Sequence, residues 1–318
     1  MSRVKRIGLV LGAGGTLGAA WTIGGLSAVQ DRIGRPLNEV DVIVGTSAGS
    51  IVAAAIRHGF TPEDLVAHQL GGGADHLPGA HEFEHDSGRL PPPPRLRVGS
   101  VRLLATAALA PHSVHPAVWA SALLPQGRSE HHTLRRYVQT LVRDDPDHWP
   151  VRDTWIVGVD YECGRRTVFG RPGSPPASLP DAVVASCSIP GWHRPTRIGD
   201  RRYVDGGVRS SASLDLLHAG GLDEVYVLAP MASRESDCRW HPAWHAERAA
   251  RQVFNAQLER ERRKVERGGA RVTLLTPGRA DLSAIGINLM DGRRRREVLQ
   301  TAQVTVEAAL RRVATRAA

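Results

Sequence analysis

The feature of this 318-residue chain that most constrains its fold is a Gly-Thr-Ser-Ala-Gly segment at residues 45–49. An apolar run at 40–44 precedes the segment and a helix-forming stretch follows it, so we expect a strand, a sharp turn and a helix with Ser47 at the apex. Gly45 and Gly49 leave room for a serine in a strained backbone, and the helix aims its positive end at the same place. The first hypothesis is therefore a serine hydrolase.

Strand and helix signals alternate along the rest of the chain. A buried strand at 4–11 is followed by a glycine turn and a helix at about 16–30, before the strand that leads to Ser47. This repeated order predicts an α/β fold in three layers, with helices on both faces of a mainly parallel central sheet. The other expected elements are strands at 154–161, 166–169, 225–229 and 271–275, and helices at 62–70, after 178–181, at 248–267 and at 294–316.

Residues 71–130 interrupt this pattern. They contain a run of four prolines and then an apolar stretch with spaced arginines at 96–104, which fits either a cap or surface-binding element over the site, or ordinary packing around a long insertion. Three histidines in the segment are too loosely spaced to favour a metal site: His76, His81 and His85. We expect one domain, in which 5–230 includes the 71–130 insertion and 231–318 completes the same fold.

The composition and charge of the chain limit the binding partners and the cellular location that we expect. No apolar run reaches the roughly 20 residues of a membrane-spanning helix, and the three scattered cysteines are typical of reduced thiols in a cytoplasm. The start of the chain imitates a signal peptide, but its short apolar run gives way to glycines. The net charge of +9 comes almost wholly from arginine, as in the run 293–296. Such arginines are either a solvated helix face or a contact for an anionic membrane surface. No nucleic-acid-binding motif is present, and nothing indicates the oligomeric state.

Two further segments bear on the chemistry. The glycine turn at 12–18 follows a strand and opens a helix, so its free backbone N–H groups predict a cradle for a phosphate or for a developing oxyanion. The second is Asp205-Gly206-Gly207, which by itself is typical of a plain turn. A serine needs a base to take its proton, and a buried carboxylate whose pKa is raised towards neutrality can be that base.

Together these segments resemble the patatin-like phospholipase family, in which a glycine-rich oxyanion motif, G-x-S-x-G and Asp-Gly-Gly occur in this order. The resemblance covers roughly 5–70 and 150–230. It implies that Ser47 attacks an ester carbonyl, that Asp205 is its general base, and that no metal or cofactor is required. It places the oxyanion donors at Gly14, Gly15 and Thr16, and the supporting motif glycines at Gly12, Gly18, Gly45, Gly49, Gly206 and Gly207.

Two residues depart from the family pattern. Ala13 stands where the family usually has glycine, and Leu17 where it has arginine or lysine. The alanine keeps the backbone donors if its φ stays negative. The leucine removes a positive charge, which makes simple ester hydrolysis easier to expect than efficient phospholipid turnover. The expected substrate is a lipid or another acyl ester, met in the cytoplasm or through transient contact with a membrane.

Three alternatives can be weighed on the same residues. A Rossmann-type reductase would need a Tyr-x-x-x-Lys pair, and the position four before Lys264 is Arg260. An α/β-hydrolase with a Ser-Asp-His triad would need a histidine after its acid, for which the chain offers His218, His241 and His245. The third alternative is a non-catalytic lipid-binding protein on a patatin-like frame, in which Ser47 and Asp205 would have no chemical purpose.

Overall fold

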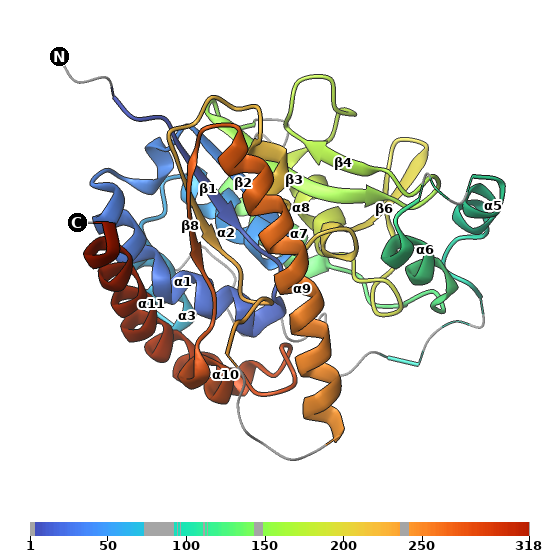
Figure 1. Cartoon of the computed structure of the whole chain (residues 1–318). Coiled ribbons are helices and arrows are strands. Elements are labelled where there is room, and N and C mark those ends of the chain that lie inside the picture. The colour runs from blue at the N-terminus through green and yellow to red at the C-terminus, as the bar shows by residue number, and fades with distance from the viewer. Residues whose placement is uncertain are drawn as a thin grey trace.

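An eight-stranded mixed sheet runs through the centre of the molecule, with helices on both faces (Figure 1). The computed structural model describes residues 4–72, 92–93, 95, 97–110, 112, 114–142, 149–235 and 242–317. The strand order is β5-β6-β3-β2-β1-β7-β8, and β4 pairs with β3 outside this path. The strands are β1 (Ile7–Leu11), β2 (Val42–Thr46), β3 (Asp153–Asp160), β4 (Arg166–Phe169), β5 (Thr196–Ile198), β6 (Arg201–Asp205), β7 (Glu224–Leu228) and β8 (Arg271–Leu275).

The sheet is parallel from β3 to β8 and antiparallel beyond β3. Strands β3, β2, β1, β7 and β8 all run in the same direction, because helical crossovers return the chain to the same edge of the sheet. On its other side β3 pairs antiparallel with β4 and β6, and β6 pairs antiparallel with β5. The mainly parallel α/β architecture expected from the sequence is confirmed, and β3 is the strand where the direction changes.

Helices cover the two faces unequally. One face carries α1, α2, α3, α7, α8, α10 and α11, whereas the long helix α9 covers the other (Figure 1). The helices are α1 (Gly15–Ile33), α2 (Ala48–Arg57), α3 (Pro62–Gln69), α5 (Val101–Leu109), α6 (Pro116–Leu123), α7 (His132–Leu141), α8 (Leu179–Ser186), α9 (Pro242–Arg267), α10 (Arg279–Ile285) and α11 (Arg295–Ala317).

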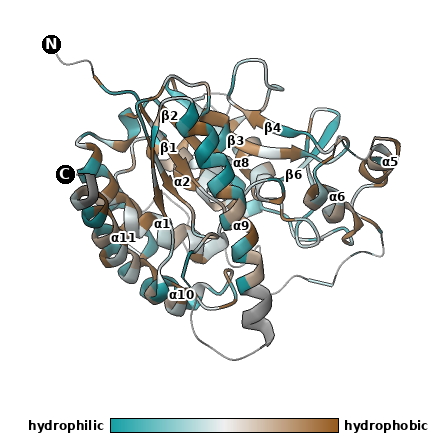
Figure 2. Ribbon diagram, in the orientation of Figure 1, coloured by the Kyte–Doolittle hydropathy of each residue, from teal (hydrophilic) through white to brown (hydrophobic). Residues whose placement is uncertain are grey.

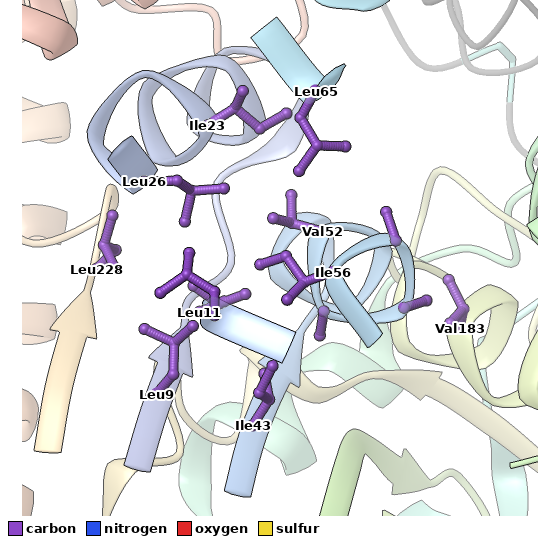
Figure 3. Close-up of a cluster of buried hydrophobic side chains, with 14 of the residues drawn as sticks. Leu9, Leu11, Ile23, Leu26, Ile43, Val52, Ile56, Leu65, Val183 and Leu228 are labelled. Carbon is purple, nitrogen blue, oxygen red and sulfur yellow. The ribbon is translucent and has the colours of Figure 1, made fainter. Parts of the chain in front are cut away.

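The period of two along β1 divides the core between the two faces. Leu9 and Leu11 join a large cluster with α1 and α2 (Figure 3), and Val10 joins a second cluster that Leu258 of α9 completes. Helix α11 packs closely on α1 because Gly24 has no side chain: a Cβ there would lie 2.5 Å from the carbonyl oxygen of Leu299. The thicker layer formed by α1, α2, α3 and α7 is the one that holds the candidate site.

Two sequence-based element boundaries need correction, and some elements were not predicted. The first strand begins at Ile7 rather than at residue 4, because Val4 is exposed and the backbone N–H of Arg6 bonds the carboxylate of Asp223 instead of a neighbouring strand. Helix α9 begins at Pro242, earlier than expected. Helix α7 was not predicted at all. Its buried residues Leu134, Tyr137, Val138 and Leu141 nevertheless follow the helical period.

The described part of the 71–130 segment forms helices α5 and α6. These pack beside the sheet on a third apolar cluster, in which Val118 meets Tyr161 of the β3 end and Val204 of β6. The Tyr161 hydroxyl donates to the carbonyl of Ser121 at 2.7 Å, which fixes α6 to the sheet. His76, His81 and His85 lie outside the described residues.

Candidate active site

Ser47 occupies the sharp turn between β2 and α2. Its backbone has φ 53° and ψ −125°, so it is one of two non-glycine residues with positive φ among the described residues. Such a conformation costs on the order of 1–3 kcal/mol and persists only where the surroundings enforce it. The turn is enforced from three sides. Ser47 N–H donates to Ser186 Oγ at 2.8 Å, and the Ser47 carbonyl accepts from the Ser50 N–H at 2.7 Å and from the Ser50 hydroxyl at 2.6 Å.

The motif glycines allow the turn to sit against its neighbours. A Cβ on Gly49 would lie 2.0 Å from the carbonyl oxygen of Leu11, and one on Gly45 would lie 2.7 Å from the Cα of Ser50. These distances are far below van der Waals contact. The two glycines are therefore required by close backbone packing at φ values that are not themselves unusual, and they press α2 onto the ends of β1 and β2.

Strand β3 brings Asp205 next to Ser47. Thr46, the last residue of β2, pairs with Val157 of β3, and Asp205 at the end of β6 pairs with Gly158. The Asp205 carboxylate lies beside the Ser47 side chain, which acts to lower its pKa, and accepts from the Gly207 N–H at 2.7 Å. The structure thus joins two residues that are 158 positions apart in the sequence, 205 minus 47.

Burial sets the acidity of Asp205. Ser47 and Asp205 are both buried, with exposed fractions of only 6% and 5%. Burial disfavours the charged carboxylate and raises the pKa of Asp205 to about 6, although the hydrogen bonds from Ser47 and Gly207 act in the opposite direction. A carboxylate with such a pKa is a stronger base than an exposed one and is still ionised at neutral pH.

The glycine turn leaves a set of backbone donors beside Ser47. Gly12 and Ala13 donate their N–H groups to the carbonyls of Leu228 and Ser211, and Leu17 donates to that of Leu289. Within the part of the chain that the structure describes, no acceptor is recorded for the N–H groups of the intervening residues, which are Gly14, Gly15 and Thr16. Gly15 has φ +60°, the left-handed conformation that glycine allows. Gly15 and Thr16 line the same pocket as Ser47.

The two departures from the motif are accommodated. Ala13 is not among the described residues with positive φ, so its side chain adds no backbone strain. Leu17 is fully buried in the large core cluster, where a charged side chain would have no solvent. A cation does reach the pocket from elsewhere: Arg295, the first residue of α11, is buried and lines it.

The pocket that opens at Ser47 is mostly apolar. It lies between α1, α2, α3 and α7, and the close-up of this region shows Ile23, Val52 and Leu65 directed towards one another (Figure 3). Its apolar lining consists of Ala19, Ile23, Ala48, Ile51, Val52, Ala55, Leu65, Leu134, Ile189 and Met290. A hydrocarbon chain gains free energy on entering such a lining, by about 0.8 kcal/mol per methylene group.

Three histidines that line the pocket were missed by sequence reasoning: His68, His131 and His193. His131 and His193 stack with ring centroids 4.0 Å apart, and His131 Nε2 lies 3.0 Å from the carbonyl oxygen of Cys187. The Ile189 N–H donates to His193 Nδ1 at 3.3 Å, so Nε2 is the protonated nitrogen of a neutral ring. Burial, followed by the charge of His131, lowers the pKa of His193 to about 2. His193 is therefore a neutral donor at every physiological pH.

The histidines proposed for a triad are placed differently. His218 is exposed at the end of a short 3₁₀ helix, with Nδ1 2.9 Å from the carbonyl oxygen of Asp215, and it does not line the pocket of Ser47. His241 lies outside the described residues, and the side chain of His245 is not described. Among the described residues, no group of three His, Cys, Asp or Glu side chains has the arrangement of a metal site.

A helix-covered, mainly parallel sheet with a serine on the strand–helix turn and an aspartate on a neighbouring strand defines a class of α/β proteins, and comparison with known proteins gives the family. The patatin-like phospholipase family matches residues 9–218. The chain therefore belongs to this family, which implies a lipid acyl hydrolase.

Solved structures are similar at low sequence identity. VipD from Legionella pneumophila aligns with a TM-score of 0.47 and 13% identity, over 97% of this chain and 67% of VipD. The type III effector protein ExoU aligns with a TM-score of 0.34 and 18% identity, over 97% of this chain and 53% of ExoU. This chain thus spans about half the length of ExoU. A search among curated proteins finds no match. Within the described residues, no helix has the length and apolar character needed to cross a bilayer.

Proposed function

We propose that this protein hydrolyses lipid acyl esters with a Ser47–Asp205 dyad and an acyl-enzyme intermediate. The observation that carries the proposal is the pairing of Thr46 and Asp205 with adjacent residues of β3, which sets the Asp205 carboxylate beside Ser47, combined with the raised pKa of Asp205 and an apolar pocket that begins at Ser47. Each of these features alone occurs in proteins without catalytic activity. Together they provide a nucleophile, its base and a place for the acyl chain.

In the first step Asp205 takes the proton from the Ser47 hydroxyl as Oγ attacks the ester carbonyl carbon. The carbonyl oxygen gains a negative charge, and we assign its stabilisation to the N–H groups of Gly14, Gly15 and Thr16; one such donor contributes about 3 kcal/mol to acyl transfer. The leaving alcohol departs with the proton from Asp205. The acyl group is then bound to Ser47 through an ester.

In the second step the same groups act on water. Asp205 takes a proton from the water molecule, whose oxygen attacks the acyl-Ser47 carbonyl, and Ser47 leaves with that proton. The free fatty acid is the second product. No residue besides Asp205 needs to exchange a proton in this scheme, and His193, whose pKa is far below neutrality, is not suited to act as the base.

The pocket indicates the substrate class. Its apolar lining suits an acyl chain, and Arg295 adds a positive charge that suits a substrate carrying a phosphate or carboxylate group. We therefore favour a phospholipase A or lysophospholipase type of reaction, at the cytoplasmic side of a membrane, over hydrolysis of small polar esters.

The test is the hydrolysis of p-nitrophenyl esters from acetate to palmitate by the wild type and by Ser47→Ala, Asp205→Ala and His218→Ala. We expect the first two variants to lose activity while remaining folded and His218→Ala to keep it. The wild-type rate should fall below about pH 6, as Asp205 becomes protonated. An inert wild type would favour the lipid-binding alternative, and an inactive His218→Ala would favour a triad.

A further inference from the structure

The exposed apolar side chains of this protein are unevenly distributed. Half of the large hydrophobic residues that the described structure exposes lie between residues 98 and 124. They are Val98, Val101, Leu109, Trp119, Leu123 and Leu124. The others are scattered singly over the surface, which is normal for a globular protein. A concentration of this kind on one small element requires an explanation.

Each of the two helices in this segment has an apolar stripe on its outer side. On α6 the buried residues are Val118, Ser121 and Ala122, whereas Trp119 and Leu123, one turn apart, are 42% and 50% exposed. On α5 Leu103 and Ala107 are buried, and Val101 and Leu109 are 63% and 88% exposed. Both helices are thus apolar on the side that packs on the sheet and on the side that faces solvent (Figure 2).

The charged side chains in the segment that contains α5 and α6 are all positive. Residues 87–129 contain no aspartate or glutamate, and they contain five arginines: Arg89, Arg95, Arg97, Arg102 and Arg128. Of these, Arg95, Arg97, Arg102 and Arg128 are exposed in the structure. A segment that joins exposed apolar side chains, a tryptophan and arginines has the composition of an element that binds at a membrane interface, and the acidic residue that pairs with one of these arginines, Glu162 with Arg102 at 3.9 Å, lies outside it.

This surface continues into the wall of the active-site pocket. Leu124 packs beside Gly191, within a loop whose residues Ile189 and His193 line the pocket. The chain after α6 then pairs with the same loop: Ser129 accepts from the Arg194 N–H at 2.9 Å, and two residues later His131 joins the pocket lining. The apolar surface and the pocket therefore share one stretch of chain.

We propose that the exposed face of α5 and α6 binds an anionic lipid bilayer and so presents the pocket to its substrate. Trp119, Leu123, Val101 and Leu109 enter the interfacial region, and the arginines contact the anionic head groups. The purpose of this contact rests on the proposed hydrolase function, but the binding itself does not require catalysis. It can be measured in a protein that cannot react.

The test uses the full-length Ser47→Ala protein and vesicle flotation. Vesicles of equimolar phosphatidylglycerol and phosphatidylcholine are compared with vesicles of phosphatidylcholine alone. We expect binding to the anionic vesicles that weakens with salt, because each arginine near an anionic surface contributes about 1 kcal/mol, which is roughly a fivefold change in partition. The additional double substitution Trp119→Ser and Leu123→Ser should lower the partition by at least about tenfold.

Matched controls come from another part of the surface. Val253 and Val304 are 63% and 69% exposed on α9 and α11, and their double substitution to serine should leave vesicle binding unchanged. Thermal unfolding midpoints show whether each variant is folded, whether or not the protein hydrolyses esters. Equal binding by the Trp119/Leu123 variant and the Val253/Val304 variant would overturn the proposal. An absence of binding by the parent Ser47→Ala protein would also overturn it and would point to a protein partner for this face.

Discussion

Ser47 and Asp205 lie side by side, yet the fold prepares them in opposite ways. Ser47 is held by strained backbone, with a positive φ that three surrounding hydrogen bonds maintain. Asp205 has ordinary backbone angles at a strand end, and burial raises its pKa to about 6. In the proposed dyad, conformational strain therefore directs the Ser47 side chain and desolvation makes the Asp205 carboxylate more basic. The first effect is geometric and the second is electrostatic.

The comparison predicts that the two residues act as one unit. Ser47→Ala and Asp205→Asn should each lower kcat/KM for a p-nitrophenyl ester by about 10⁴-fold or more, and the double variant should be no worse than either single variant. Steady-state kinetics with all three proteins provides the measurement. Losses that multiply in the double variant would show that the residues contribute separately, and the dyad scheme would then be wrong.

The strained turn that holds Ser47 can be disrupted by a substitution at Gly49. Alanine there would place a Cβ 2.0 Å from the carbonyl oxygen of Leu11, and neither backbone can yield easily. We expect Gly49→Ala to reduce the free energy of unfolding by about 3 kcal/mol or more. Chemical denaturation measures the effect. Gly72→Ala, where the nearest atom is 3.5 Å away and φ is not positive, should be close to neutral.

The desolvation of the Asp205 carboxylate can be tested by removing its charge. Its folded pKa lies above the ordinary value of 3.8, so the native state binds more protons than the unfolded state between about pH 3.8 and 6. Stability contributed by this group consequently falls as the pH rises through that window. Asp205→Asn should stabilise the protein at pH 8 by about 1–3 kcal/mol, and the gain should vanish near pH 3.5. Unfolding curves of wild type and variant at the two pH values check the sign; a gain that is equal at both would contradict burial of the charged carboxylate as the cause.

The smallest effect is expected at Ser186. This residue supports the elbow, by which we mean the sharp turn between β2 and α2 that carries Ser47. Its Oγ accepts from the Ser47 N–H and donates to the Val157 carbonyl at 2.6 Å. Ser186→Ala leaves both groups buried without this partner, which costs about 1–3 kcal/mol of stability. We expect kcat to fall by about tenfold with little change in KM, since the orientation of Ser47 is affected and the pocket is not.

Ser188→Ala is the matched control on the aspartate side. The Ser188 contact with Asp205 is made by its backbone carbonyl, which the substitution keeps. Its hydroxyl bonds Val184 and Thr196 instead. An equal loss of kcat in both variants would show that general loosening, rather than the support of the elbow, explains the effect.

The sequence predicted the local parts of the site and missed the contacts between distant parts. The elbow could be predicted because glycine spacing, an apolar strand and a helix lie next to each other in the chain. The pairing of Asp205 with Ser47 was inferred only through the family resemblance, since no local pattern reveals which strand lies beside β2. Ser186 and His131 were missed for the same reason: their contacts are with residues far away in the sequence, and a serine at the end of a helix carries no signal of its own.

The fold, too, could be predicted where it depends on local sequence and not where it depends on contacts between distant segments. Most strands were predicted from apolar runs, whereas the antiparallel direction of β6 depends on the length and path of the connection before it. Helix α7 has a regular apolar period within a polar stretch, which could have been recognised. The sequence of α5 and α6 fitted both a surface-binding element and ordinary packing around an insertion. Both helices carry apolar residues on two sides, so the sequence does not show which side is buried.

Both members of the proposed dyad are positioned by one strand, β3, because Thr46, the residue before Ser47, pairs with Val157 and Asp205 pairs with Gly158. A consequence concerns how such proteins diversify. The stretch of chain between α3 and α7 can be lengthened, shortened or exchanged without altering the separation of the proposed nucleophile and base, because that separation is fixed by two adjacent residue pairs of the sheet. The insertion is therefore a place where new lipid preferences can be grafted onto an unchanged reaction centre, in evolution and in protein engineering alike.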